Sequence, residues 1–225
     1  MQSLLKINLN GGLKRLVSTL ICLMMVLATF PMHMLLNTVC AQEGDEEKQQ
    51  ISITLSGADD VKNWMSNNFN DIDGIIGGID RINITLGDNI AVTEDDQKMG
   101  ESAYFFDFTD SKFAGKTITV AGSNKTIKIN NASLSFLKLQ DCTVILKNIT
   151  VDGGSVSRSS DFIQVDGATG QNLSNLSIAD VNIQNCPISS AGVYVIKNAG
   201  TLQITSGSIQ FNKENAIGNS GTIYI

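Results

Sequence analysis

The chain has 225 residues and a net charge of −6 at neutral pH, from 16 basic and 22 acidic residues. Loss of the N-terminal leader described below would remove three basic residues and bring the net charge to about −9. Because phosphate backbones and anionic lipids repel an acidic chain, we expect neither nucleic acid nor an anionic membrane surface as a partner.

The first 41 residues have the layout of a secretory signal peptide. They contain no Asp or Glu, carry Lys6, Lys14 and Arg15, and continue into a largely apolar stretch over residues 16–30. Small residues at the two positions that a signal peptidase reads predict cleavage before Gln42. The leader therefore predicts a secreted or cell-surface protein.

Two other fates of the leader stay open. Apolar residues resume after Pro31 and lengthen the stretch toward a membrane span, so an uncleaved anchor is one alternative. A lipoprotein modified at Cys40 is the other. If cleavage occurs, it removes His33, the only histidine, and excludes Ser-His-Asp, Cys-His and histidine-metal chemistry in the exported chain.

An acidic linker and an amphipathic helix follow the leader. Residues 42–50 are polar and acidic, which is typical of a solvated linker. Next, Ser56 can cap a helix whose first turn carries two aspartates, where negative charge is favoured. The apolar face of this helix is formed by Val61, Trp64, Met65 and Phe69. We expect Trp64 in the core, and we assign residues 51–112 to an N-terminal cap and first coil.

From Arg81 onward, nearly every segment has the alternation of a β-strand. Ile82, Ile84 and Leu86 share one face of the first such segment. Turns rich in Gly, Asn, Asp and Ser separate the later ones. These later runs are Ile118/Val120, Ile127/Ile129, Leu134/Phe136, Phe162 to Val165, Val193/Val195 and Ile223/Ile225. We assign residues 113–225 to stacked coils.

One pattern of two short alternating runs occurs three times, beginning at Val144, Leu176 and Leu202. The starts are 32 and 26 residues apart, a spacing typical of a solenoid. A second run follows each copy, at Phe162, Val193 and Ile223, so each coil has at least two strand faces. The pattern predicts an all-β parallel β-helix. Its structural rival is an antiparallel β-sandwich, for which few hairpin dipeptides are present.

Polar residues recur at the bend of each repeat. Asn148, Asp180 and Ser206 would form a ladder if the coils stack in register, and Asn185 with Asn212 would form a second. Such side chains bind backbone groups exposed at turns, so we interpret these positions as structural.

Several segments resemble a known family. Residues 56–64, 82–90, 116–129 and 144–154 look like the start of a pectate-lyase-like adhesive domain of bacterial surface proteins. The tail, residues 209–225, is similar to the Phe-x-x-Asn and Gly-Gly-Ala-Ile repeats of polymorphic outer-membrane and autotransporter-type proteins. The resemblance covers residues 51–225 and implies a right-handed β-helix capped by an N-terminal helix. It does not select a function, because this fold hosts lyases, hydrolases, phage tailspikes and adhesins.

One local cluster could bind a ligand. A pectate-type lyase needs a calcium ion on carboxylates and a basic residue on a neighbouring coil, and turn aspartates supply the oxygen ligands that calcium prefers. The candidates for calcium or carbohydrate are Asp152, Arg158, Asp161, Asp166 and Asp180. We predict no catalytic residue, because acidic turns are common on an acidic protein and no catalytic motif accompanies them.

Cysteines and sequons add little. Cys142 and Cys186 are interpreted as small buried residues at turns, with a disulfide between them left open. Six Asn-x-Ser/Thr sequons begin at Asn83, Asn124, Asn131, Asn148, Asn172 and Asn175. We interpret them as by-products of Asn, Ser and Thr in turns and strands; glycosylation in a eukaryotic host is the alternative.

The sequence as a whole predicts an exported, non-catalytic β-helix that presents a face to glycans or surface proteins. A polysaccharide lyase or glycoside hydrolase with active residues beyond Ile225 and a structural spacer are the alternatives. The last segment ends on a strand, so we expect either further coils or self-association at an open C-terminal coil. Membrane attachment would come only from an uncleaved leader or from a further C-terminal region.

Overall fold

The computed structural model describes residues 49–67, 79–93, 102–210 and 215–225. The chain divides into two compact units, Met1–Leu35 and Leu36–Ile225, and the first lies wholly outside the described residues. The leader, most of the linker, Phe69 and Asn212 are also outside them, so the predictions made for these parts stay predictions.

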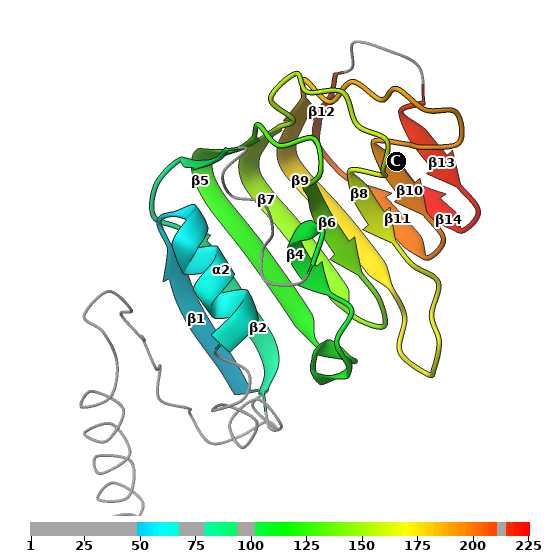
Figure 1. Cartoon of the computed structure of the whole chain (residues 1–225). Helices are drawn as coiled ribbons and strands as arrows, with labels where there is room; N and C mark the ends of the chain where they lie inside the picture. Colours follow the sequence, from blue (N-terminus) through cyan, green and yellow to red (C-terminus); the bar gives the residue numbers. More distant parts are fainter. Residues whose placement is uncertain (1–48, 68–78, 94–101, 211–214) are drawn as a thin grey trace, which may run out of the picture. The chain divides into compact units, whose positions relative to one another are not determined.

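The second unit is built from parallel β-strands in two sheets (Figure 1). The nine-stranded sheet has the order β1-β2-β5-β7-β9-β11-β14, with β3 on β5 and β12 on β9, and the five-stranded sheet has the order β13-β10-β8-β6-β4. The strands are β1 Gln49–Leu55, β2 Ile79–Leu86, β3 Ile90–Val92, β4 Tyr104–Phe108, β5 Thr117–Ile129, β6 Ser135–Leu139, β7 Thr143–Asp152, β8 Ile163–Val165, β9 Asn175–Gln184, β10 Ile196–Asn198, β11 Thr201–Ile204, β12 Gly207–Ile209, β13 Ile217–Asn219 and β14 Thr222–Tyr224. Every strand pairing among the described residues is parallel, which argues against the β-sandwich.

The chain passes alternately between the two sheets, so that β5, β7 and β9 lie in the first and β6, β8 and β10 in the second. Register confirms the repeat: Val144 pairs with Leu176, and Leu176 pairs with Leu202. Ile118 pairs with Val144 and begins one more copy. The arrangement is all-β, mostly parallel and compatible with a parallel β-helix.

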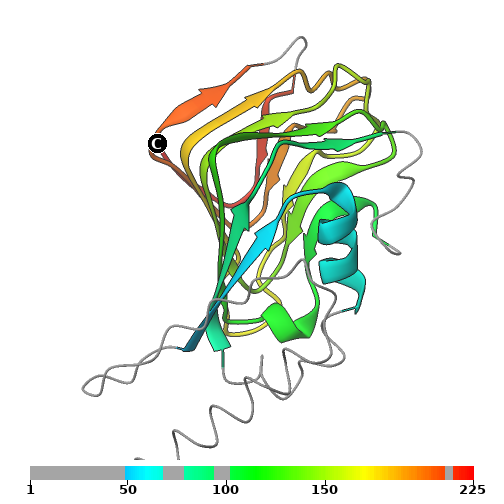
Figure 2. The same cartoon turned by 90° about the vertical axis from the view of Figure 1, so that its left-hand side faces the viewer.

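The long strands β5, β7 and β9 turn a corner within the first sheet (Figure 2). In β7 and β9 the corner residues are Asn148 and Asp180, with φ angles of 51° and 54°. Both are exposed, and the residues flanking them pair on either side of the corner. The backbone N–H of Asp180 donates to Ser206 Oγ at 2.8 Å. The predicted alignment of Asn148, Asp180 and Ser206 is therefore confirmed. Asn and Asp tolerate the left-handed backbone at the first two corners, whereas in the third copy the positive φ angle, 122°, falls at Gly207.

Buried aliphatic side chains of both sheets form the core, and a cluster of buried phenylalanines lies on β4, on β6 and at the residue before β8. Adjacent rings in this cluster lie 4.9–6.1 Å apart between centroids. Its members are Phe105, Phe106, Phe108, Phe136 and Phe162. Such ring pairs add to the burial energy of the core and join β4, β6 and β8.

The predicted helix is present as α2, Ala58–Asn67. Trp64 is 2% exposed, and its ring lies 6.3 Å from that of Phe108 in β4 and 6.5 Å from that of Phe113 in the 3-10 turn η1, Ser111–Phe113. The helix thus packs beside β4, the edge strand of the second sheet. At the start of the helix, the backbone N–H of Ser56 donates to the Asp60 carboxylate at 2.9 Å.

Other differences concern strands that the sequence analysis missed or misplaced. Strand β1 begins at Gln49, inside the predicted linker. It was not predicted as a strand, although Ile51, Ile53 and Leu55 alternate with polar residues. Strand β4 has adjacent buried phenylalanines and so breaks the alternation. Ile223 pairs with Leu202 in the first sheet, so the second-sheet strand that follows the third copy is β13.

Candidate functional site

The predicted site residues lie in three separate places. Asp152 and Asp180 lie in the first sheet, Arg158 is in the interior, and Asp161 and Asp166 lie at the two ends of the β8 segment in the second sheet. Within the described ranges, no group of three or more His, Cys, Asp or Glu residues could hold a metal ion. The calcium prediction has no carboxylate cluster to support it in this part of the chain.

Asp152 closes a turn at the end of β7. Its carboxylate accepts hydrogen bonds from the Gly154 N–H at 2.7 Å, from Asn185 Nδ2 at 2.9 Å and from Gln184 Nε2 at 3.0 Å. Burial raises the pKa of Asp152, but these hydrogen bonds outweigh it and hold the pKa below its ordinary value. One oxygen of Asp152 thus binds its own turn and the other binds the next coil, so Asp152 acts as a turn residue.

Arg158 is fully buried, which the sequence did not indicate. Its Nη2 donates to the carbonyls of Ile129 at 2.7 Å and Gly153 at 3.0 Å. These two residues come directly after Lys128 of β5 and Asp152 of β7, which are paired. The guanidinium carbon lies 4.7 Å from the ring centroid of Phe162. Burial lowers the pKa of Arg158, and the neighbouring Cys186 partly offsets this effect. Arg158 braces two coils from inside and has no exposed atom with which to contact a surface polysaccharide.

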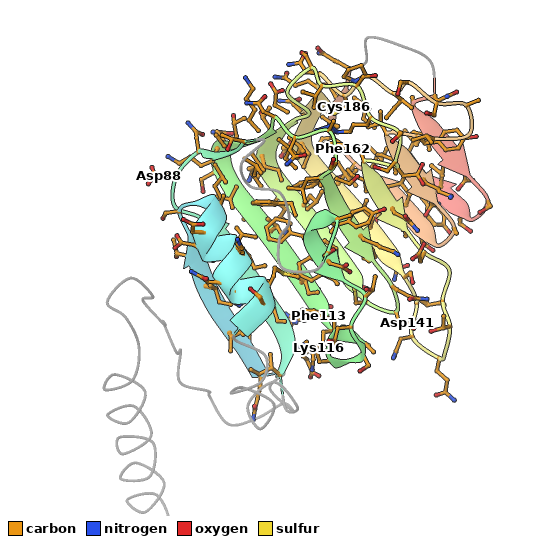
Figure 3. All side chains as sticks on the ribbon, viewed as in Figure 1. Asp88, Phe113, Lys116, Asp141, Phe162 and Cys186 are labelled. Atoms are coloured by element: carbon orange, nitrogen blue, oxygen red, sulfur yellow. The ribbon has the colours of Figure 1, made fainter. Side chains whose placement is uncertain are left out.

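Figure 3 labels Phe162 and Cys186, which both border Arg158. Cys186 and Cys142 are free and buried, as predicted for small residues at turns. Burial raises the pKa of each thiol to about 12. Both sulfurs face carbonyl oxygens, at 3.1 Å for Gln184 and 3.6 Å for Phe108. They behave as core residues, because a protonated buried thiol is a poor nucleophile and metal ligand.

The outer side of the second sheet carries a set of interacting polar side chains around an aromatic residue, Tyr104. Register places Asp107, Lys138, Gln164 and Lys197 side by side, one from each of four neighbouring strands. We call this surface the tyrosine face and define it as Tyr104, Lys138, Asp161, Gln164, Asp166 and Lys197.

One half of the tyrosine face is a closed network around Tyr104. Its hydroxyl donates to Gln164 Oε1 at 2.7 Å, and Gln164 Nε2 donates to Asp166 Oδ1 at 2.5 Å. The other oxygen of Asp166 lies 3.5 Å from Lys138 Nζ, which is 5.8 Å from the Tyr104 ring centroid. Side chains from β6 and from the β8 segment therefore hold the ring of Tyr104 in place.

The other half centres on Asp161. This carboxylate accepts from the Tyr194 backbone N–H at 2.8 Å and lies 3.4 Å from Lys197 Nζ. The Tyr194 ring covers Gly218 so closely that a Cβ there would lie 2.5 Å from it. The tyrosine face thus continues toward β13 through a second aromatic ring.

Electrostatics join the two halves. Burial raises the pKa of Tyr104 to about 12, and the negative charges of Asp161, Asp166 and Asp107 add to this effect. Tyr104 therefore stays neutral and serves as a hydrogen-bond donor and an apolar surface, rather than as a base. Of the five predicted residues, the structure brings only Asp161 and Asp166 to this face.

Tyr104, Lys138, Gln164 and Lys197 were not predicted from the sequence. For the last three the available signal was their place between inward residues of short strands, for example Lys138 between Leu137 and Leu139, whereas Tyr104 begins the irregular strand β4 and has no such signal. That signal identifies outward positions but not which strands are neighbours, so it could not assemble the face.

Comparisons with protein-family models, curated proteins and solved structures find no match for this chain. Among the residues that the structure describes, no helix is long and apolar enough to cross a membrane.

Proposed function

We propose that this chain is an exported, non-catalytic binding protein of the pectate-lyase-like adhesive type, folded as a right-handed parallel β-helix. The repeat register, the alternation of strands between two sheets and the right-handed habit of parallel crossovers support the fold. The leader sequence supports export to the cell surface or beyond.

We propose that the tyrosine face binds glycans. The observation that carries this proposal is the pre-ordered ring of Tyr104 within the network of Gln164, Asp166 and Lys138. Ligand sites combine apolar or aromatic surface with a few placed polar groups. A sugar ring presents one apolar side and a rim of hydroxyls, so an aromatic ring edged by amide, carboxylate and ammonium groups matches it.

A non-catalytic role is favoured over a lyase or hydrolase by the chemistry of the candidates. Arg158 is buried, Tyr104 is neutral, and the carboxylates of Asp161 and Asp166 already accept bonds or ion pairs within the face. Inverting hydrolysis needs two carboxylates placed around a water, one as acid and one as base. The two carboxylates of the tyrosine face instead have partners within it, the Tyr194 N–H and Lys197 for Asp161, and Gln164 and Lys138 for Asp166.

Binding of the purified protein to an immobilised glycan panel tests the proposal. We expect a binding signal that Tyr104→Ala lowers about tenfold, since an aromatic contact is worth on the order of 1 kcal/mol or more. Thr119→Ala, an outward change in β5 of the first sheet, is the matched control and should leave the signal unchanged. Binding that depends on Thr119 and not on Tyr104 would contradict the assignment, and release of reducing or unsaturated sugar ends would favour the enzyme.

A further inference from the structure

The tyrosine face carries two aspartates and two lysines. Asp107, on the outward side of the adjoining strand β4, adds a third negative charge that acts on Tyr104 together with Asp161 and Asp166. Each lysine already lies on an aspartate, Lys138 on Asp166 and Lys197 on Asp161. An acidic glycan would therefore have to compete with aspartates for both ammonium groups.

The same contacts show that this face suits ammonium groups. Lys138 Nζ lies 3.5 Å from the Asp166 carboxylate and 5.8 Å from the Tyr104 ring centroid, and both groups attract a cation. The two Lys–Asp distances, 3.5 and 3.4 Å, exceed the roughly 2.7–2.9 Å of a tight charge-assisted hydrogen bond. A carboxylate has about four lone-pair sites, so Asp161 and Asp166 keep acceptor capacity for a further ammonium.

The charged side chains of the tyrosine face are exposed enough for a ligand to reach them. The side chains of Lys138 and Asp166 are 29% and 27% exposed, so a ligand can reach both. The side chain of Lys197 is 50% exposed and that of Asp161 10%, so a ligand ammonium reaches Asp161 by displacing Lys197. The acid excess of the whole chain adds a long-range attraction for a cationic polymer.

We propose that the tyrosine face binds a polymer of amino sugars with free ammonium groups, such as deacetylated chitin. This rests on the proposed function and narrows it from glycans in general to cationic ones. Sugar rings lie against Tyr104 and Tyr194, and their ammonium groups lie against Asp161 and Asp166.

Calorimetric titration with three oligosaccharide series of equal length tests this assignment: glucosamine, N-acetylglucosamine and galacturonate. We expect glucosamine oligomers to bind about tenfold or more tightly than the N-acetylated series, with binding that weakens as salt is raised. Asp161→Asn with Asp166→Asn should remove most of this preference. The change is isosteric, and the carbonyl oxygen of the amide introduced at position 161 can still accept from the Tyr194 N–H.

Asp180→Asn is the matched control, because it removes a negative charge from an exposed corner of the first sheet. It should leave the preference unchanged, and thermal unfolding monitored for all variants checks that each is folded. Equal or better binding of N-acetylglucosamine or galacturonate oligomers that still depends on Tyr104 would overturn the ammonium assignment and leave the glycan proposal intact. Absence of binding to all three series and to the wider glycan panel would overturn both.

Discussion

Replacing Asn148 tests the corner of the long strands. Asn148 is exposed and has a φ angle of 51°, so the effect of a substitution there comes from the backbone rather than from lost packing. A left-handed conformation costs an ordinary L-residue roughly 1–2 kcal/mol, and a β-branched side chain is among the least tolerant. We therefore expect Asn148→Val to lower the free energy of unfolding by about 1–2 kcal/mol. Glycine adopts this conformation freely, so Asn148→Gly should stay within about 0.5–1 kcal/mol of the wild type.

Urea unfolding followed by far-UV circular dichroism measures the difference. With a slope of about 2 kcal/mol per molar urea, Asn148→Val should lower the midpoint by about 0.5–1 M. Thr150→Val is the control, because it removes the same sequon and places the same valine two residues away in ordinary strand geometry, where its effect should be small. If the valine variant at 148 is as stable as the glycine variant, the left-handed corner does not exist as described.

Two further predictions concern the core. Leu146 is fully buried between Val120 and Ile178, so Leu146→Ala should lower the free energy of unfolding by about 2–5 kcal/mol in the same assay. Ile145→Ala, on the outward side of β7, should lower it clearly less. Equal losses for the two variants would mean that the register is wrong by one residue. Burial raises the pKa of the Cys142 and Cys186 thiols to about 12. Both should therefore resist a thiol-specific reagent in the folded protein at mildly alkaline pH and react fully in urea. Fast labelling of either cysteine in the folded state would contradict their burial.

Strands with a clear two-residue period could be predicted from the sequence, and irregular strands could not. The copies at Val144, Leu176 and Leu202 were aligned correctly, because an alternating strand can bury its apolar side in only one register. Strand β4 was missed, since Phe105 and Phe106 are both buried and no alternation marks them. There, the aromatic cluster overrides the two-residue period.

Long-range placement accounts for what the sequence analysis could not find at the site. Arg158 was predicted as a candidate for binding carbohydrate or calcium, yet it lies inside, because carbonyls of two successive coils and the ring of Phe162 receive its guanidinium. Likewise, Asp152 and Asp180 were grouped with Asp161 and Asp166, but the fold sends the two pairs to different sheets.

The sequence by itself determined the repeat, the strand class, the helix before it and the polar corners, because each depends on residues close together in the chain or on a regular spacing. Only the tertiary structure decided which outward side chains meet. Tyr104 and Gln164 are 60 residues apart in sequence, and they come within 2.7 Å because β4, β6 and β8 are neighbours in one parallel sheet. The order of strands in a sheet is set by packing across the whole core, so the tyrosine face exists only in the folded chain.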